Sequence, residues 1–147
     1  MTKIKYRKLS HSIYHCNYHI VWTPKYRYRL LKGIVADFVE DKIRQISEWK
    51  EVEIIELNIQ KDHVHMVCSI PPKLSISTYM GIMKGKSAMA IFKGFPSLKL
   101  KLYWGNHFWA PGYCVDTVGL DAEKIRKYVK YQENKERQEK QLTLKFK

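Results

Sequence analysis

The sequence contains few cysteines and no long hydrophobic run. Its three cysteines, Cys16, Cys68 and Cys114, are widely spaced and include no CxxC pair, so they give neither a disulfide framework nor a cysteine zinc finger. No apolar stretch reaches the roughly 18 residues that indicate a transmembrane helix. The basic segment 1–8 lacks the apolar stretch of a signal peptide. These absences predict a cytoplasmic protein with reduced thiols.

Acidic residues are also scarce. Asp and Glu total 14 against 27 Lys and Arg, which gives a formal net charge of +13. Such an excess suits a polyanionic partner, either nucleic acid or an anionic membrane. Membrane binding would favour an amphipathic helix with a basic face, and no such helix dominates the sequence. We therefore expect a nucleic-acid partner and no membrane partner.

The pattern of apolar residues predicts one α+β domain over residues 1–147, with a polar tail at 136–147. The expected strands cover residues 12–23, 52–60, 63–70 and 107–118, the last broken by Pro111-Gly112. The expected helices cover 34–49 and 75–92, with a loop at 93–106 and a last helix from Asp121. The first six elements follow the order of the ferredoxin-like (RRM-like) fold, an antiparallel sheet with helices on one face.

Two histidines stand two residues apart in the expected strand 63–70. Strand alternation places Val64 and its apolar neighbours on one face, and His63 and His65 together on the other, open face. Their Cα atoms would lie about 6.6 Å apart, which allows both imidazoles to bind one metal. A bare His-x-His pattern is common, so two ordinary surface histidines remain the alternative.

The other histidines are weaker candidates for a metal site. His15 and His19 also share a face of the expected strand 12–23, but four residues along a strand separate them by about 13 Å. We expect them not to share one metal. His11 and His107 are isolated in the sequence.

The expected last helix carries two tyrosines and a glutamine. Steps of roughly 100° per residue place Tyr128 and Gln132 as neighbours beside the apolar stripe, while Tyr131 points further out. A tyrosine can attack a phosphodiester and hold DNA covalently, and a metal that polarises the phosphate assists the attack. Two imidazoles with the Gln132 carbonyl oxygen would suit Mn²⁺ or Mg²⁺. Alternatively, Tyr128 packs against the sheet and Gln132 is solvated.

Seven short motifs, spread over roughly residues 10–135, resemble the single-tyrosine HUH transposases of the IS200/IS605 group. The motifs are HIVWTPKYR (19–27), DHVHM (62–66), PPKLSIS (71–77), MKGKS (83–87), FWAPGY (108–113), TVG (117–119) and YVKYQ (128–132). Each motif is short, but their order and spacing together are specific.

The resemblance implies a role for each candidate residue. His63, His65 and Gln132 would bind the metal and Tyr128 would be the nucleophile, although Tyr131 lies nearby. Members of this group are homodimers in which the tyrosine helix of one subunit can complete the other subunit's site. They recognise subterminal hairpins and cut single-stranded DNA at the ends of the element. Cutting leaves a 5′-phosphotyrosine and a free 3′-OH.

Basic and aromatic residues provide candidate DNA contacts. Basic groups can pair with phosphates, and aromatic rings can stack on unpaired bases. The candidates follow the first expected strand or lie in the second expected helix: Lys25, Tyr26, Arg27, Arg29, Lys84 and Lys86.

Two other functions fit the same sequence. One is a domesticated relative that cuts hairpin DNA but no longer moves an element. The other is a non-catalytic nucleic-acid-binding module. Such a module usually exposes aromatic residues on its central strands, and the histidines of strand 63–70 disfavour it.

Overall fold

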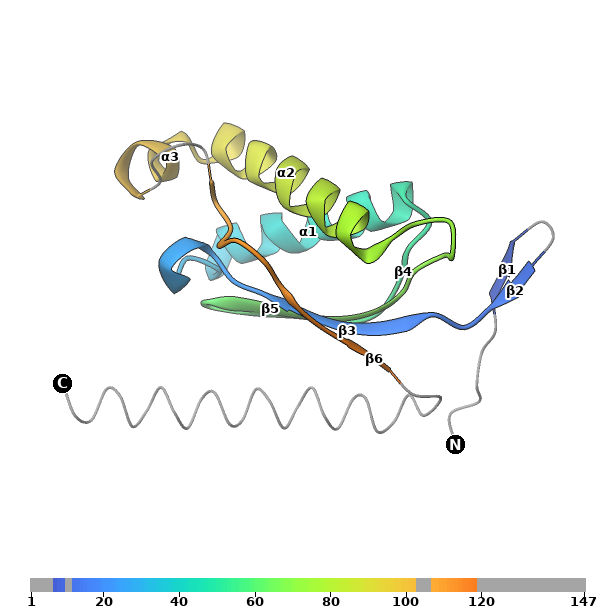
Figure 1. The fold of residues 1–147 in the computed structure, drawn as a ribbon. Helices are drawn as coiled ribbons and strands as arrows, with labels where there is room; N and C mark the ends of the chain where they lie inside the picture. The colour runs from blue at the N-terminus through green and yellow to red at the C-terminus, as the bar shows by residue number, and fades with distance from the viewer. Residues whose placement is uncertain (1–6, 10–11, 103–106, 119–147) are drawn as a thin grey trace, which may run out of the picture.

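The computed structural model describes residues 7–9, 12–102 and 107–118. Its centre is a four-stranded antiparallel sheet of β3 (Asn17–Trp22), β4 (Glu53–Gln60), β5 (His63–Ser69) and β6 (Cys114–Thr117), in the order β4-β5-β3-β6 (Figure 1). This is the strand order of a ferredoxin-like sheet. The predicted fold class is therefore confirmed, and β5 lies in the interior of the sheet with a neighbour on each side.

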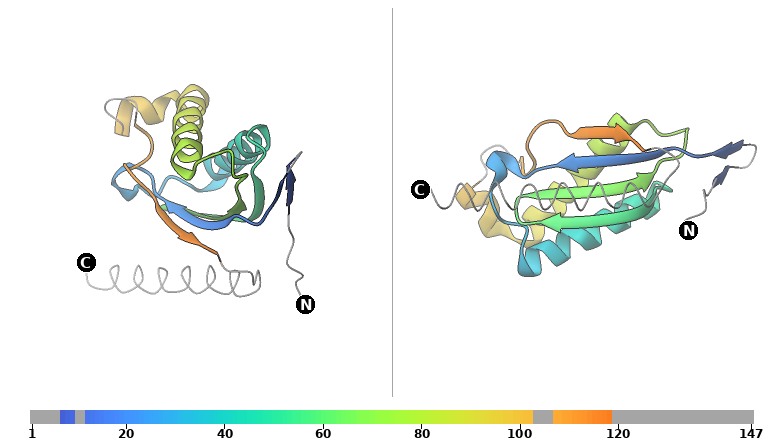
Figure 2. Two further views of the ribbon diagram at one scale, coloured as in Figure 1. Left: turned by 45° about the vertical axis from the view of Figure 1, so that its right-hand side comes forward. Right: turned by 90° about the horizontal axis from the view of Figure 1, so that it is seen from below.

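Two helices, α1 (Gly33–Trp49) and α2 (Ile76–Gly94), cover one face of this sheet (Figures 1 and 2). Helix α2 begins at the Ser75 N-cap, whose hydroxyl accepts a hydrogen bond from the Thr78 backbone amide at 3.1 Å. Both helices start and end within two residues of the predicted bounds. None of the helices described is long and apolar enough to cross a membrane.

The hydrophobic core lies between the helices and the sheet. Strand alternation directs Val64, Met66 and Cys68 of β5 toward the helices, where all three are fully buried. Their partners in the core include these residues of β3, α1 and α2: Ile20, Trp22, Val39, Ile43, Met80 and Met83. The predicted apolar face of strand 63–70 is therefore confirmed as the core face.

The structure differs from the prediction at the N-terminal end of the first strand. Residues 12–23 do not form one strand, because β2 (Ser12–Tyr14) pairs with β1 (Arg7–Leu9) in a separate two-stranded sheet. This hairpin projects beyond one end of the main sheet (Figure 1). Of the predicted strand 12–23, only the part that forms β3 belongs to the main sheet.

The predicted loop 93–106 contains the short helix α3 (Pro96–Leu102). Proline is well suited to a first helical position, since its fixed φ matches the helix and its missing N–H is not needed there. The predicted break at Pro111-Gly112 is confirmed: β6 begins at Cys114, beyond Gly112, whose φ of +80° interrupts extended backbone. The predicted last helix and the polar tail lie outside the described residues.

Candidate metal centre and nucleic-acid groove

His63 and His65 lie on the sheet face opposite the helices, as alternation along β5 predicts. Their ring centroids are 4.5 Å apart and the rings meet edge to face. The expectation that they stand on an open face is wrong, because only 2% of His63 and 1% of His65 is exposed. In the sheet, His65 is paired with Val21 of β3 and Asn58 of β4, and His63 is paired with Gln60 of β4. The pair therefore does not consist of surface histidines.

Asp62 holds the ring of His63. Its Oδ1 lies 2.7 Å from Nδ1 of His63, and its Oδ2 accepts a hydrogen bond from Nη2 of Arg27 at 3.2 Å. A carboxylate can only accept, so Nδ1 of His63 carries a proton. In the neutral ring this leaves the lone pair on Nε2. Such a carboxylate partner is typical of a metal-binding histidine.

His19 is the residue that the sequence analysis missed. It lies on β3 and is 5% exposed, and its Nε2 is 3.4 Å from Nδ1 of His65. The contact arises because β3 and β5 are antiparallel neighbours, with Val21 paired to His65 and His19 paired to Val67. Spacing along one strand cannot reveal a contact between two strands.

Burial favours the neutral forms of His19 and His65. The pKa of His65 is lowered to about 3, mainly by burial and also by His63 and His19, while Asp62 acts in the opposite direction. Burial likewise lowers the pKa of His19, and Asp116 partly opposes that shift. A neutral imidazole is the form that binds a metal.

The donor set fits part of a metal site. Two imidazoles, whose Nδ1 atoms face Asp62 and His19, can present their Nε2 atoms to one cation. Within the described ranges, no group of three His, Cys, Asp or Glu side chains is placed to hold a metal. The predicted third ligand, Gln132, and the predicted nucleophile, Tyr128, lie outside those ranges.

The basic and aromatic segment after β3 forms a short 3-10 helix, Lys25–Arg27. Tyr26 and Arg27 have φ values of 60° and 52°, in the left-handed region that non-glycine residues seldom adopt. Tyr26 is 69% exposed, and its ring centroid lies 5.5 Å from that of Tyr28. The segment thus presents aromatic rings to solvent while Arg27 reaches Asp62. Arg29 is also exposed.

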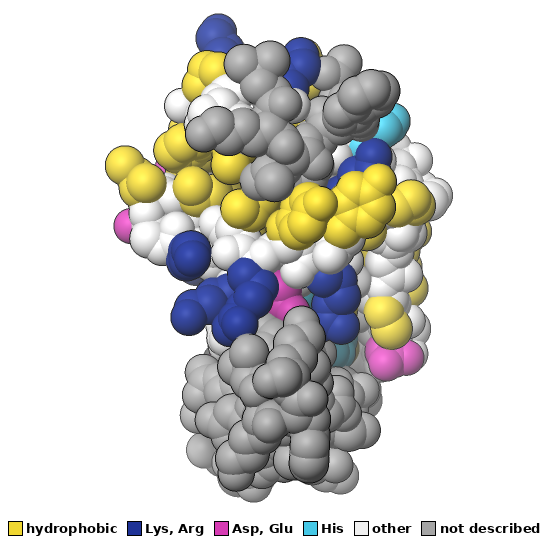
Figure 3. Space-filling view, turned by 90° about the vertical axis from the view of Figure 1, so that its left-hand side faces the viewer, with side chains coloured by type: hydrophobic (Ala, Val, Ile, Leu, Met, Phe, Trp, Pro, Cys, Tyr) yellow, Lys and Arg dark blue, Asp and Glu magenta, His cyan; other side chains and the backbone are white. Residues whose placement is uncertain are grey.

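A groove of about 910 Å³ lies between α2, α3 and residues 107–111. We call it the α2–α3 groove. Its rim carries Lys25, Lys84, Lys93 and Lys99, and its floor includes Phe92, Phe108 and Trp109. Figure 3 shows Lys and Arg side chains beside hydrophobic ones at this end of the molecule.

The two lysines predicted in the second helix have different surroundings. Lys84 donates to the backbone carbonyls of Ala110 and Gly112 at 2.7 and 2.9 Å, and burial lowers its pKa. It therefore holds the wall of the α2–α3 groove in place. The Nζ atom of Lys86 lies 5.2 Å from the ring centroid of Trp49, and Lys86 does not line the groove.

Known proteins are similar to this chain in sequence and in fold. A family model described as "Transposase IS200 like" matches residues 12–132. The chain is 41% identical over 140 residues to the transposase for insertion sequence element IS200 of Salmonella typhimurium, covering 95% of this chain and 91% of that protein. It is 38% identical over 125 residues to the ISDra2 transposase TnpA of Deinococcus radiodurans, covering 84% and 89%.

Two solved structures with a similar fold are also described as transposases. A crystal structure of a protein from Deinococcus radiodurans, assigned as a transposase, matches with a TM-score of 0.71 and 34% identity, over 87% of this chain and 96% of that one. A REP-associated tyrosine transposase bound to a REP hairpin matches with a TM-score of 0.59 and 17% identity, over 86% and 68%. At that identity the second likeness concerns the fold alone.

Proposed function

Because this chain belongs to the IS200-like transposase family, we propose that it cuts and rejoins single-stranded DNA at the ends of an insertion sequence. Cleavage would proceed through a 5′-phosphotyrosine. The observation that carries this proposal is the buried pair His63 and His65, whose Nδ1 atoms face Asp62 and His19. A buried imidazole pair of this kind, with a partner at each Nδ1, suits metal binding better than a role on a solvated surface.

The proposed metal site consists of His63, His65 and Gln132. A bound Mg²⁺ or Mn²⁺ would polarise the scissile phosphate and stabilise the charge that develops on it. Tyr128 would attack the phosphorus and displace the 3′ oxygen. The sheet and its neighbours keep both histidine rings fixed and largely shielded from water, so that little reorganisation is needed when the phosphate arrives.

The proposed DNA partner is a single strand that carries a subterminal hairpin. The net charge of +13 supports a polyanionic partner, and the resemblance to the single-tyrosine HUH transposases supports hairpin DNA as that partner. The lysines of the α2–α3 groove would contact phosphates, and its apolar floor or the exposed ring of Tyr26 would contact unpaired bases.

We also propose a homodimer in which the tyrosine helix of one subunit completes the site of the other. The family resemblance supports this arrangement. Sedimentation velocity in the presence of hairpin DNA tests it, and a strictly monomeric, fully active protein would count against it.

The proposed reaction is tested by incubating the protein with labelled single-stranded hairpin DNA and Mn²⁺ or Mg²⁺. We expect site-specific cleavage that stops when the metal is chelated. Tyr128→Phe should abolish cleavage while hairpin binding is retained, because only the attacking oxygen is removed. Tyr131→Phe is the matched control and should remain active. Cleavage by Tyr128→Phe, or cleavage without metal, would overturn the assignment.

A further inference from the structure

The contact between His19 and His65 has the geometry of an edge-to-edge hydrogen bond. The two ring planes differ by only 12°, and the centroids are 5.7 Å apart while the nitrogens are 3.4 Å apart. The centroid separation exceeds the distance between the nitrogens by about the sum of the two ring radii, so both nitrogens lie close to the line that joins the centroids. The rings therefore meet through Nε2 of His19 and Nδ1 of His65 rather than through their faces.

One proton can occupy this contact, and its position decides what His65 can do. A neutral imidazole has one N–H and one acceptor nitrogen. If His19 donates, the proton of His65 must reside on Nε2, and that nitrogen has no lone pair for a metal. If His65 donates from Nδ1, its Nε2 keeps the lone pair, and the proton of His19 resides on Nδ1.

The neighbouring residues favour the second arrangement. His63 already has this tautomer, because its Nδ1 faces the carboxylate of Asp62 at 2.7 Å. On the other side of β3, Asp116 is the direct cross-strand partner of His19. Paired side chains point to the same face of a sheet, so a negative charge stands beside His19 and favours the N–H that His19 needs on Nδ1.

We propose that His19 is a positioning residue that accepts a hydrogen bond from Nδ1 of His65 and so directs the Nε2 lone pair of His65 to the metal. Asp62 does the same for His63. The two metal-binding rings thus share one tautomer, set by a carboxylate in one case and by a third histidine in the other. The role toward the metal rests on the proposed function; the tautomer of His65 does not.

Long-range ¹H–¹⁵N correlation spectra of the metal-free protein test the tautomer directly, since they distinguish a protonated from an unprotonated ring nitrogen. In the wild-type protein we expect His65 to carry its proton on Nδ1. His19→Phe keeps an aromatic ring but removes the acceptor, so the proton of His65 should redistribute toward Nε2. His19→Gln offers a carbonyl oxygen as acceptor and should restore the wild-type signal.

Calorimetric titration with Mn²⁺ tests the consequence for metal binding. Loss of a residue that orients a ligand typically weakens metal affinity about 10–100-fold, and we expect this loss in His19→Phe with recovery in His19→Gln. His15→Phe is the matched control, because His15 contacts the side-chain amide of Asn17, and this variant should bind Mn²⁺ like the wild type.

A wild-type spectrum with the His65 proton on Nε2 would overturn the inference, and this measurement needs no variant. Equal Mn²⁺ affinity in His19→Phe and wild type would overturn it as well. If the wild-type protein binds no metal while His65 is protonated on Nδ1, the proposed function fails and the assigned tautomer stands.

Discussion

Asp62 shows how one buried carboxylate can serve two partners at the residue scale. It is 5% exposed, and its two oxygens contact His63 and Arg27. Arg27 follows β3 and His63 begins β5, so Asp62 links the segment after β3 to the start of β5, beside the histidine pair. The side chain of Arg27 is 57% exposed, and a pair with one exposed member adds little to stability. The main effect of Asp62 is therefore on the orientation of His63.

We expect Asp62→Ala to weaken Mn²⁺ binding about 10–100-fold, because the ring of His63 loses the acceptor that fixes its tautomer. Asp62→Asn retains an oxygen at the same position and should lose less affinity. Isothermal titration calorimetry measures both variants. Wild-type affinity in Asp62→Ala would show that this carboxylate does not orient a metal ligand.

Part of the candidate site could be predicted from the sequence. Alternation in strand 63–70 is a local property, and it correctly placed His63 and His65 together on the face away from the core. The contact of His65 with His19 depends on the register between β3 and β5, which no local pattern contains. Burial of the pair was also missed, since it depends on what surrounds the strand.

At the element scale, α1 and α2 are joined by a buried polar contact. The hydroxyl groups of Ser47 on α1 and Tyr79 on α2 are 2.6 Å apart. Both residues are almost fully buried, and Tyr79 lies in the core beneath the helices. Burial raises the pKa of Tyr79, so its phenol keeps its proton.

We expect Tyr79→Phe to lower the free energy of unfolding by about 1–3 kcal/mol, because the hydroxyl of Ser47 would remain buried without its partner. Ser47→Ala should cost a similar amount. The double variant should cost less than the sum of the two, since no unsatisfied hydroxyl remains. Urea unfolding measures all three, and strictly additive losses would contradict the account.

The elements differ in how far local sequence determines them. In α1 and α2 the helical spacing of apolar residues extends over many residues. The structure confirms both predicted helices, and each begins and ends within two residues of the predicted bounds. The hairpin of β1 and β2 was missed because pairing between two three-residue strands leaves almost no periodic signal. Helix α3 was missed because Gly94, Pro96 and Gly105 are typical of a loop, whereas Pro96 in fact begins the helix.

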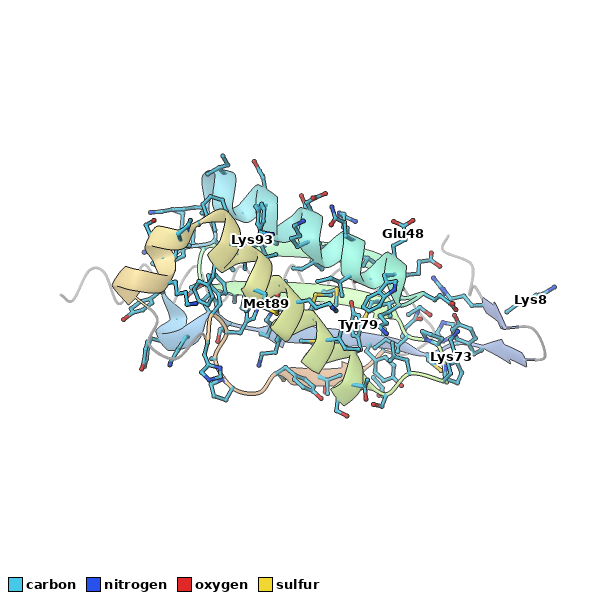
Figure 4. All side chains as sticks on the ribbon, turned by 90° about the horizontal axis from the view of Figure 1, so that it is seen from above. Lys8, Glu48, Lys73, Tyr79, Met89 and Lys93 are labelled. Carbon is cyan, nitrogen blue, oxygen red and sulfur yellow. The ribbon has the colours of Figure 1, made fainter. Side chains whose placement is uncertain are left out.

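At the scale of the whole molecule, the α2–α3 groove lies at one end (Figure 3) and four lysines line it: Lys25, Lys84, Lys93 and Lys99. Figure 4 shows Lys93 on the outer side of α2 near this end, while Lys73 lies near the other end, where it pairs with Glu51 at 2.8 Å. Both lysines contribute equally to the net charge. Substituting each lysine in turn therefore distinguishes a local contact with DNA from a general effect of net charge.

We expect Lys93→Ala to weaken hairpin binding and to reduce the slope of log affinity against log salt by about 0.7–0.9, the value for one lost phosphate contact. Lys73→Ala should change neither quantity appreciably. Fluorescence anisotropy over a range of KCl concentrations measures both slopes. Equal effects of the two substitutions would show that the groove does not contact the DNA.

The central claim is that a metal held by the buried histidine pair assists attack by Tyr128 on single-stranded DNA. Mass-spectrometric mapping of the covalent protein–DNA adduct, formed on hairpin DNA with Mn²⁺, tests it most directly. We predict an adduct on the peptide containing Tyr128 that is absent with chelator and absent in His63→Ala and His65→Ala. An adduct on another residue, or an undiminished adduct in either histidine variant, would contradict the account.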